Sequence, residues 1–353
     1  GDICVKQSSK LAQKDLENMD GSYPIFGASG LIKKINTYDQ KAEYVAVVKD
    51  GAGVGRTMLL PAYSSVIGTL QYLIPNDNFN AKYLYYAVKS RHLEKYYTGS
   101  AIPHIYFKDY KSEPIILFDR IAQKKIVLVL ERVEKIIEKQ KQQLEMLDTL
   151  IKARFVEMFG DPMNNPCGYE HIKLSDIATY FNGLTYKPEN VTEDGTIVLR
   201  SSNIQNGQLD FLDTVRVNCA IKERIMVQEN DILMCSRNGS AKLVGKVALV
   251  KDIQEPMSFG AFMMIIRSQY FGYLMTYFQM DAFRQQIKTS ATTTINQITG
   301  RMLDNITIPL PPITMVEQYT AFIEQVDKSK SAIQKSLEKT QTLFDSLMQE
   351  YFG

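Results

Sequence analysis

The sequence Ala153-Arg-Phe-Val-Glu-Met-Phe-Gly160 closes one long heptad segment, and Met348-Gln-Glu-Tyr-Phe-Gly353 closes another. Their terminal pairs, Phe159-Gly160 and Phe352-Gly353, lie 193 residues apart, since 353 − 160 = 193. Apolar positions before the first pair keep that offset, so that Leu130, Leu144, Ile151 and Met158 map onto Ile323, Leu337, Phe344 and Tyr351. The chain is therefore a tandem duplication of one unit, a globular head followed by a long helix.

Each heptad segment predicts one helix, with apolar residues at alternating steps of three and four. The first helix occupies 118–160, with heptads from Asp119 to Phe159, and Gly160-Asp161-Pro162 ends it. Its seam is Ile126, Leu130, Val133, Ile137, Leu144, Leu147, Ile151 and Met158. The second helix occupies 312–353, with the seam Val316, Tyr319, Ile323, Val326, Ile333, Leu337, Phe344, Leu347 and Tyr351. We expect an antiparallel pair about 60 Å long; the alternative is that each helix docks on its own head.

The remaining residues form two heads, 1–117 and 161–311, in an α+β fold with a pseudo-twofold internal repeat. Their starts match, because Gly1-Asp2-Ile3 resembles Ser175-Asp176-Ile177. In the first head we expect strands at 44–48 and 58–60 and a helix at 81–96. In the second head we expect strands at 197–200, 231–235 and 244–250 and a helix at 271–287.

Composition excludes several classes of protein. With 45% hydrophobic residues, 23% charged residues and a net charge of +2, the chain is globular, and a polyanion would have to meet local patches. The spacing of the four cysteines predicts reduced thiols in a cytoplasmic protein. No apolar run is long enough to cross a membrane, and the scattered histidines disfavour a metal site. The chain begins with Gly1 rather than Met, so we expect a leading segment to be missing.

Two glycine-containing turns occupy matching places in the heads. Gly51-Ala-Gly-Val-Gly55 resembles a dinucleotide-binding loop, but the strand expected after it favours a β-turn over a phosphate site. Its counterpart is Ser236-Arg-Asn-Gly-Ser240. Their polar side chains are candidates for contacts with phosphates or guanine edges: Lys49, Arg56, Arg237, Asn238 and Lys242. A solvated hairpin is the alternative for each turn.

Two further pairs of polar loops supply candidate DNA contacts. Ser29 and Lys33 follow a strand in the first head, as Arg200, Ser202 and Asn203 do in the second. The segments 98–105 and 289–298 also match, and each precedes the expected final strand of its head. Their candidate residues, with one just beyond, are Ser100, His104, Thr293, Asn296, Gln297 and Arg301. Hydroxyl, amide and imidazole groups suit hydrogen bonding to base edges, although polar loops without a ligand are also common.

No catalytic motif of the GxSxG, HExxH or Walker type is present. Instead, the doubled order of head and helix resembles the DNA specificity (S) subunit of type I restriction–modification systems. The resemblance covers essentially the whole chain. It is carried by the two heads, the heptad helices, the segments 113–123 and 308–318 before the helices, and the two helix ends quoted above.

The resemblance implies two target-recognition domains, each reading one half of a bipartite, asymmetric sequence in double-stranded DNA. The helices would act as a ruler between the half-sites. Two methyltransferase (modification) subunits, carrying S-adenosylmethionine for adenine methylation, would dock on the chain, and restriction/translocase subunits would join them. The chain itself would bind no cofactor and catalyse nothing.

One feature departs from the family pattern. Aligning Gln123 with Gln318 gives an offset of 195 rather than 193, which predicts a two-residue shift before the helices. Three other functions remain open: the targeting subunit of another bipartite complex, a coiled-coil adaptor that bridges two protein partners, and a nucleotide-dependent enzyme built on Gly51–Gly55.

Overall fold

The computed structural model describes residues 1–99, 103–290 and 296–353. The fold is α+β, and the chain forms two compact units that each contain one head and part of both long helices. Unit 1 comprises Gly1–Gln142 and Ile333–Gly353, and unit 2 comprises Gln143–Ala332.

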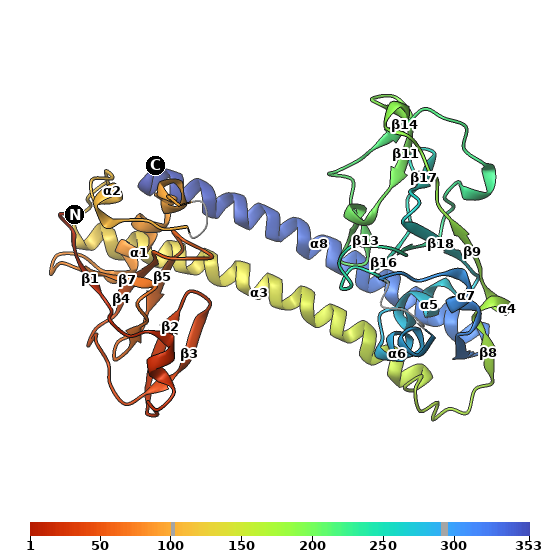
Figure 1. Cartoon of the computed structure of the whole chain (residues 1–353), viewed down its shortest axis with the longest axis horizontal. Coiled ribbons are helices and arrows are strands. Elements are labelled where there is room, and N and C mark those ends of the chain that lie inside the picture. Colours follow the sequence, from red (N-terminus) through yellow and green to blue (C-terminus); the bar gives the residue numbers. More distant parts are fainter. Residues whose placement is uncertain (100–102, 291–295) are drawn as a thin grey trace. The chain divides into compact units, whose positions relative to one another are not determined.

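The main sheet of unit 1 has four antiparallel strands (Figure 1). Their order is β1 (Cys4–Ser8), β7 (Leu70–Pro75), β4 (Tyr44–Val48) and β5 (Thr57–Leu60). Every residue of β4 is buried, and its alternate side chains enter two separate cores. This two-sided burial explains the uninterrupted apolar sequence Tyr-Val-Ala-Val-Val. A smaller sheet contains β3 (Gly30–Ile35), β2 (Tyr23–Gly27) and β6 (Ser65–Val66), with β2 and β6 parallel.

The main sheet of unit 2 repeats this order. Its strands are β9 (Thr179–Asn182), β18 (Met263–Arg267), β15 (Ile232–Cys235) and β16 (Val247–Leu249). The central strand β15 is again wholly buried and divides its residues between two cores. The second sheet has β10 (Val191–Thr192), β14 (Arg216–Val217), β11 (Thr196–Leu199) and β17 (Met257–Phe259), with β11 and β17 parallel. Two short pairs complete the unit: β12 (Ile204–Gln205) with β13 (Gln208–Leu209), and β8 (His171–Lys173) with β19 (Thr307–Pro309).

The two predicted head helices are each interrupted. Instead of one helix over 81–96, unit 1 has α1 (Ala81–Lys89) and a 3-10 turn, η2 (Leu93–Tyr96), because His92 adopts a left-handed φ of 51°. Instead of one helix over 271–287, unit 2 has α5 (Phe271–Tyr277) and α6 (Asp281–Ser290). Between them Gln279 and Met280 donate to carbonyls three residues back, a tight turn that ends α5. The predicted strand over 244–250 is shorter, since Gly245, with φ of 79°, still belongs to the preceding loop.

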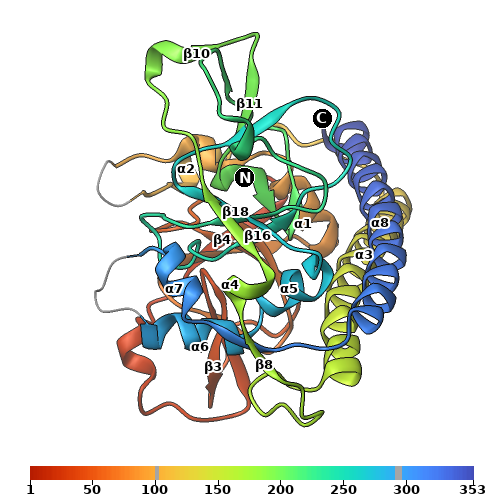
Figure 2. The same ribbon diagram turned by 90° about the vertical axis from the view of Figure 1, so that its right-hand side faces the viewer.

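The two long helices are α3 (Arg120–Phe159) and α8 (Ile313–Phe352), each of 40 residues. Within each unit they run antiparallel and side by side (Figures 1 and 2). In unit 1, Gln140 Nε2 donates to Ser336 Oγ at 2.8 Å, and in unit 2 the Tyr319 hydroxyl donates to the Ile151 carbonyl at 3.0 Å. Every predicted seam residue is buried or half-buried, so the heptad prediction is confirmed.

The predicted two-residue shift before the helices is wrong. Both ends of α3 and α8 obey the offset of 193, since 120 and 159 correspond to 313 and 352. Gln123 therefore corresponds to Val316, and both are buried, at 2% and 1% exposure, whereas Gln318 is exposed. Gln123 uses its side chain inside unit 1, where Oε1 accepts from Asn80 N and Nε2 donates to the Phe118 carbonyl.

The Phe-Gly ends of the long helices anchor them in the heads. In unit 1, the Phe352 ring packs on Tyr83 of α1, with centroids 5.2 Å apart. In unit 2, the Phe159 ring packs on Tyr273 of α5 at the same distance. The two tyrosines make matching bonds, since the Tyr83 hydroxyl donates to Ile116 O at 2.5 Å and the Tyr273 hydroxyl to Pro309 O at 2.8 Å. Each helix therefore begins beside the head that precedes it and ends in the core of the other unit.

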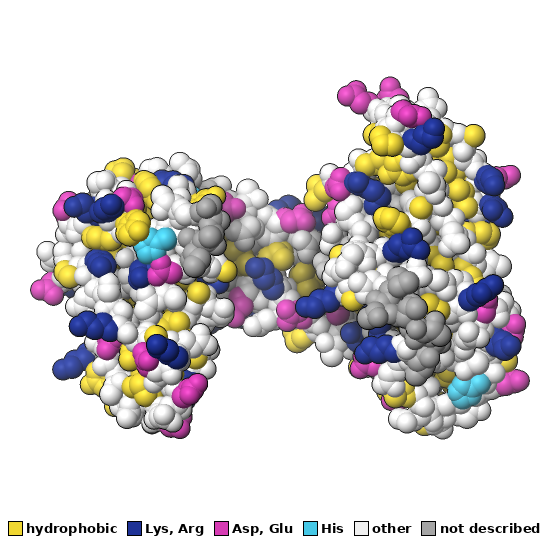
Figure 3. Space-filling model, in the orientation of Figure 1, with side chains coloured by type: hydrophobic (Ala, Val, Ile, Leu, Met, Phe, Trp, Pro, Cys, Tyr) yellow, Lys and Arg dark blue, Asp and Glu magenta, His cyan; other side chains and the backbone are white. Residues whose placement is uncertain are grey.

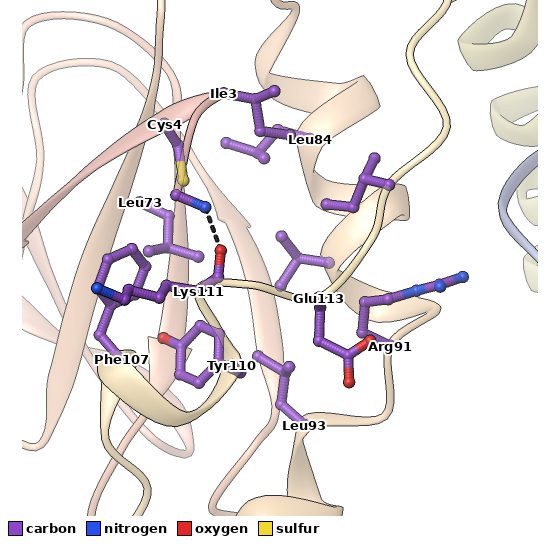
Figure 4. A pocket seen from close by; sticks show the side chains of 13 residues that line it. Ile3, Cys4, Leu73, Leu84, Arg91, Leu93, Phe107, Tyr110, Lys111 and Glu113 are labelled. Carbon is purple, nitrogen blue, oxygen red and sulfur yellow. Dashed lines mark hydrogen bonds between the residues drawn. The ribbon is translucent and has the colours of Figure 1, made fainter.

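Within the described ranges, no helix is long and apolar enough to cross a bilayer. Figure 4 shows a cavity under β1 in unit 1, beside the hydrogen bond from Gly1 N to Lys111 O. Its volume is about 30 Å³, enough for a water molecule or two but not for an organic ligand. The cysteines Cys4, Cys167, Cys219 and Cys235 are unpaired.

Candidate nucleic-acid interface

In unit 1, the loop after the central strand β4 is fixed by main-chain hydrogen bonds. Lys49 N and Asp50 N both donate to Thr69 O, at 2.9 and 3.3 Å. Ile105 N donates to Lys49 O at 3.0 Å, and Gly51 N donates to Pro103 O at 2.9 Å. These bonds hold the residues around His104 against the loop 49–56.

The loop after the central strand β15 in unit 2 has the same bonds. Ser236 N and Arg237 N both donate to Phe262 O, at 2.9 and 3.1 Å. Ile298 N donates to Ser236 O at 2.7 Å, and Asn238 N donates to Asn296 O at 3.4 Å. The loops predicted to match in the sequence therefore match in structure. The loop of unit 2 is the longer one, extending over 236–246.

Both loops close on a glycine. Gly55 has φ of 86° and donates to Val48 O, and Gly245 has φ of 79° and donates to Cys235 O, both at 2.8 Å. In unit 1 the chain then enters strand β5 at Thr57, not a helix. The sequence Gly51–Gly55 thus forms the predicted turn and lacks the helix N-terminus that a dinucleotide-binding loop places at the phosphates.

A third loop joins the other two in each unit. In unit 1, Arg56 Nη1 donates to Ala28 O in the β2–β3 turn at 2.9 Å. In unit 2, Asn238 Nδ2 donates to Ser201 Oγ, just after β11, at 3.4 Å. We call the result the three-loop surface. It consists of residues 27–30, 49–56 and 103–104 in unit 1 and of residues 200–203, 236–246 and 296–297 in unit 2.

On the three-loop surface of unit 1, Asp50 accepts hydrogen bonds from two predicted residues. Its Oδ2 accepts from Lys49 Nζ at 2.6 Å, and its Oδ1 accepts from His104 Nδ1. Burial pushes the pKa of the Asp50 carboxyl upward, but these two bonds outweigh burial and leave that pKa below its ordinary value. The His104 ring also packs on Tyr106, with centroids 4.1 Å apart.

On the three-loop surface of unit 2, the side chain of Arg237 contacts both Gln297 and Phe262. Its Nη2 and Nε donate to Gln297 Oε1 at 2.6 and 3.2 Å. Its guanidinium carbon lies 5.8 Å from the centre of the Phe262 ring, which is 59% exposed. Asn296 Nδ2 donates to Gly239 O at 3.1 Å and ties the third loop to the second.

Most of the predicted residues lie on these surfaces. In unit 1, Ser29 is exposed in the β2–β3 turn beside Ala28, and Arg56 and His104 join the loops. In unit 2, Ser202 is exposed, while Arg237, Asn238, Asn296 and Gln297 hold the loops together. The predicted residues Ser100 and Thr293 lie outside the described ranges.

The remaining predicted residues lie off these surfaces, as Lys33 and Arg301 do, or turn their side chains to other groups of the same unit. Lys33 lies in β3 and binds Asp20 and the Leu16 carbonyl, at 2.8 and 2.9 Å. Asn203 is buried, and Arg200 binds Asp213 at 2.7 Å. Lys242 lines an open cavity of about 1180 Å³ that α3 and α8 also line, and Arg301 is exposed on α7 (Gly300–Asp304). The loop around His104 leads to a short helix, α2 (Phe107–Tyr110), rather than to the expected final strand.

Basic side chains do not gather into one patch on the face of either unit that Figure 3 shows. Figure 3 shows dark blue Lys and Arg side chains dispersed among white and yellow surface on the face of each unit. Magenta carboxylates lie between them. This dispersal agrees with the net charge of +2 and offers no broad basic patch that would attract polyanions in general.

Comparison with known proteins decides the family. A family model described as the type I restriction modification DNA specificity domain matches residues 1–146 and 166–341. The chain belongs to this family. The two matched stretches contain all described residues of the three-loop surfaces, so both surfaces are parts of specificity domains.

Individual relatives agree with this assignment. The EcoKI specificity subunit of Escherichia coli K12 is 30% identical over 183 residues, which cover 48% of this chain and 39% of that subunit. The alignment thus spans well under half of that relative. The MjaVIII specificity subunit of Methanocaldococcus jannaschii is 22% identical over 375 residues, covering 93% of this chain and 86% of that subunit. The crystal structure of the S subunit from M. genitalium shares the fold, with a TM-score of 0.61, 16% identity and coverage of 100% and 94%.

Sequence reasoning missed Asp50 on the three-loop surface of unit 1. It also missed Thr69 and Phe262, whose carbonyls accept from Asp50 N and Arg237 N beside the two surfaces. Asp50 lies between Lys49 and Arg56, but a lone carboxylate in a loop does not by itself indicate a DNA contact. Thr69 and Phe262 lie in short turns before β7 and β18. The 193-residue offset of the repeat leads from Thr69 to Phe262 and is the signal that would have found both.

Proposed function

We propose that this chain is the sequence-reading component of a type I restriction–modification complex, in which each unit reads one half of a bipartite, asymmetric DNA target. The observation that carries the proposal is the pair of three-loop surfaces. The main-chain hydrogen bonds that hold the loops are equivalent in the two units, yet the side chains on the two surfaces differ. A repeated frame with unlike side chains suits two unlike half-sites, whereas two identical surfaces would favour a palindrome.

The chemistry of the surfaces supports base reading. Unit 2 presents an arginine and amide side chains, the groups that most often hydrogen-bond guanine and adenine edges in the major groove. Unit 1 presents a carboxylate and an imidazole. Because the net charge is only +2, we expect partner subunits to supply much of the contact with the phosphates.

The long helices offer a place for those partners. In unit 1, α3 exposes Ile121, Leu128 and Ile136 at 69%, 53% and 47%. Ile121 and Leu128 lie seven residues apart and so share the face opposite the buried seam. Exposed apolar side chains on an already paired helix favour a further helical partner. We assign this role to two methyltransferase subunits, which would hold S-adenosylmethionine and methylate adenine while this chain catalyses nothing. Restriction subunits would join the same complex.

In vitro selection tests the proposal. The chain, purified together with its methyltransferase subunits, is incubated with duplexes that carry a long randomised segment, and the bound DNA is sequenced. We expect enrichment of two short motifs separated by a fixed gap. The methyltransferase subunits without this chain serve as the control and should enrich neither motif.

The main competing function is a coiled-coil adaptor between two protein partners. An adaptor would leave the bound pool as random as the input, even though the complex assembles. Size-exclusion chromatography of the same preparation shows whether assembly took place, so that result would overturn the DNA-reading function.

A further inference from the structure

We propose that three structurally matched positions determine which bases each unit reads. They are Asp50, Thr69 and His104 in unit 1, and Arg237, Phe262 and Gln297 in unit 2. The inference rests on the proposed DNA-reading function and assigns that function to particular atoms. It further predicts that unit 2 reads a guanine and that unit 1 reads a base with an exposed amino group.

The match between the positions follows from main-chain hydrogen bonds rather than from side-chain similarity. Asp50 N donates to Thr69 O, as Arg237 N donates to Phe262 O. Asp50 also forms an antiparallel bridge with His104, as Arg237 does with Gln297. Since these hydrogen bonds involve only main-chain atoms, the three side chains can differ between the units while the loops keep the same arrangement. They differ strongly, and the matched residues Asp50 and Arg237 carry opposite charges.

In unit 2, the guanidinium of Arg237 is held in a defined plane. Along one edge of the guanidinium, Nε and Nη2 both donate to Gln297 Oε1. The Phe262 ring lies beside the guanidinium. Among the hydrogen bonds of the described residues, Nη1 makes none, and Nη2 keeps a second hydrogen. These two nitrogens form a parallel pair of donors. Such a pair matches the O6 and N7 acceptors of guanine in the major groove.

In unit 1, the matching place offers acceptors instead. The Asp50 carboxylate accepts one bond on each oxygen, from Lys49 and His104, and a carboxylate has about four acceptor sites. The side chain is 28% exposed, so the remaining sites are accessible from solvent. Because His104 uses Nδ1 as the donor to Asp50, its Nε2 is an acceptor in the neutral ring. Acceptors at this place match the amino group of cytosine or adenine.

Three variants of the full chain, each expressed with the methyltransferase subunits, test this assignment by sequencing of methylated host DNA. Arg237→Ala should relax one position of one half-site, with discrimination for guanine falling on the order of 10-fold or more. Asp50→Asn, which is nearly isosteric, should alter one position of the other half-site only. Lys222→Ala removes an exposed cation of unit 2 outside the three-loop surface and should leave the motif unchanged.

A purely structural role for these residues has a different signature. It would lower the unfolding temperature of Arg237→Ala or Asp50→Asn while the methylated motif stayed that of the parent chain, and this result would overturn the inference. Failure of the proposed function itself is distinguishable, because the parent chain would then direct no bipartite motif at all.

Discussion

Asn203 and Ser202 are neighbours of similar polarity, and the sequence alone gave them the same role. In the structure Ser202 is exposed on the three-loop surface, whereas Asn203 is buried. Asn203 Nδ2 donates to the carbonyls of Asp210 and Asp213, at 2.8 and 2.9 Å, and its Oδ1 accepts from Arg200 N. The difference depends on the return of residues 210–213 to this point, which no local pattern around Asn203 indicates.

This difference predicts opposite effects of two substitutions. Asn203→Ala removes a buried amide that makes three hydrogen bonds to the main chain, and we expect it to lower the free energy of unfolding by about 1–3 kcal/mol in urea titrations. Ser202→Ala is the matched control and should change that free energy by less than about 0.5 kcal/mol. Equal effects of the two substitutions would refute the structural role of Asn203.

The lowered pKa of Asp50 predicts a dependence of stability on pH. A carboxylate whose pKa is lower in the folded chain stabilises the fold above its ordinary pKa and loses this contribution as the pH falls through the folded value. Asp50→Asn should therefore reduce the unfolding temperature near pH 7, and the difference from the parent chain should shrink as the solution is acidified. The exposed Asp109, changed to Asn, is the control. A difference that grew towards acid would contradict the assignment.

Among the elements, the two long helices were the most predictable. The heptads predict their seams and the Phe-Gly pairs predict their ends, and α8 (Ile313–Phe352) lies within one residue of the predicted 312–353 at each end. The strands β4 and β15 also lie where their apolar runs predict them. The head helices were less predictable, because a left-handed turn at His92 and a tight turn at Gln279 lie inside continuous helical patterns. Such turns are set by packing in the heads rather than by local propensity.

The anchoring of the helix ends predicts effects that stay within one unit. Phe159→Ala should cost about 3–5 kcal/mol and Phe352→Ala a similar amount, because both side chains are buried among aromatic rings. Hydrogen exchange should rise in α5 for Phe159→Ala and in α1 for Phe352→Ala. Val156→Ala, at an exposed position of α3, is the control. Exchange that rose equally in both head helices would contradict separate anchoring.

At the scale of the whole molecule, the duplication was visible in the sequence, but its full extent was not. Gly1-Asp2-Ile3 and Ser175-Asp176-Ile177 do precede matching strands, β1 and β9, and the sheet orders of the two units are the same. The pairing of the three loops was not predictable. It joins residues such as Asp50 and His104, or Arg237 and Gln297, which are more than fifty positions apart and carry unlike side chains in the two units.

The ruler hypothesis predicts the effect of shortening both helices. Removal of the matching heptads 140–146 and 333–339 keeps the seam in register and shortens each helix by about 10 Å. We expect the gap between the half-sites to shrink by about three base pairs, or DNA binding to be lost. The gap is read from in vitro selection, and circular dichroism confirms that the shortened chain is folded. An unchanged gap in a folded variant would reject the hypothesis.

The central claim is that this chain chooses the DNA sequence at which its complex acts. The most direct test maps adenine methylation across the genome of a host that expresses the chain with its methyltransferase subunits, and of the same host without the chain. The account predicts one bipartite motif with a fixed gap, methylated only when the chain is present. Methylation that is the same in both hosts, although the complex is intact, would contradict it.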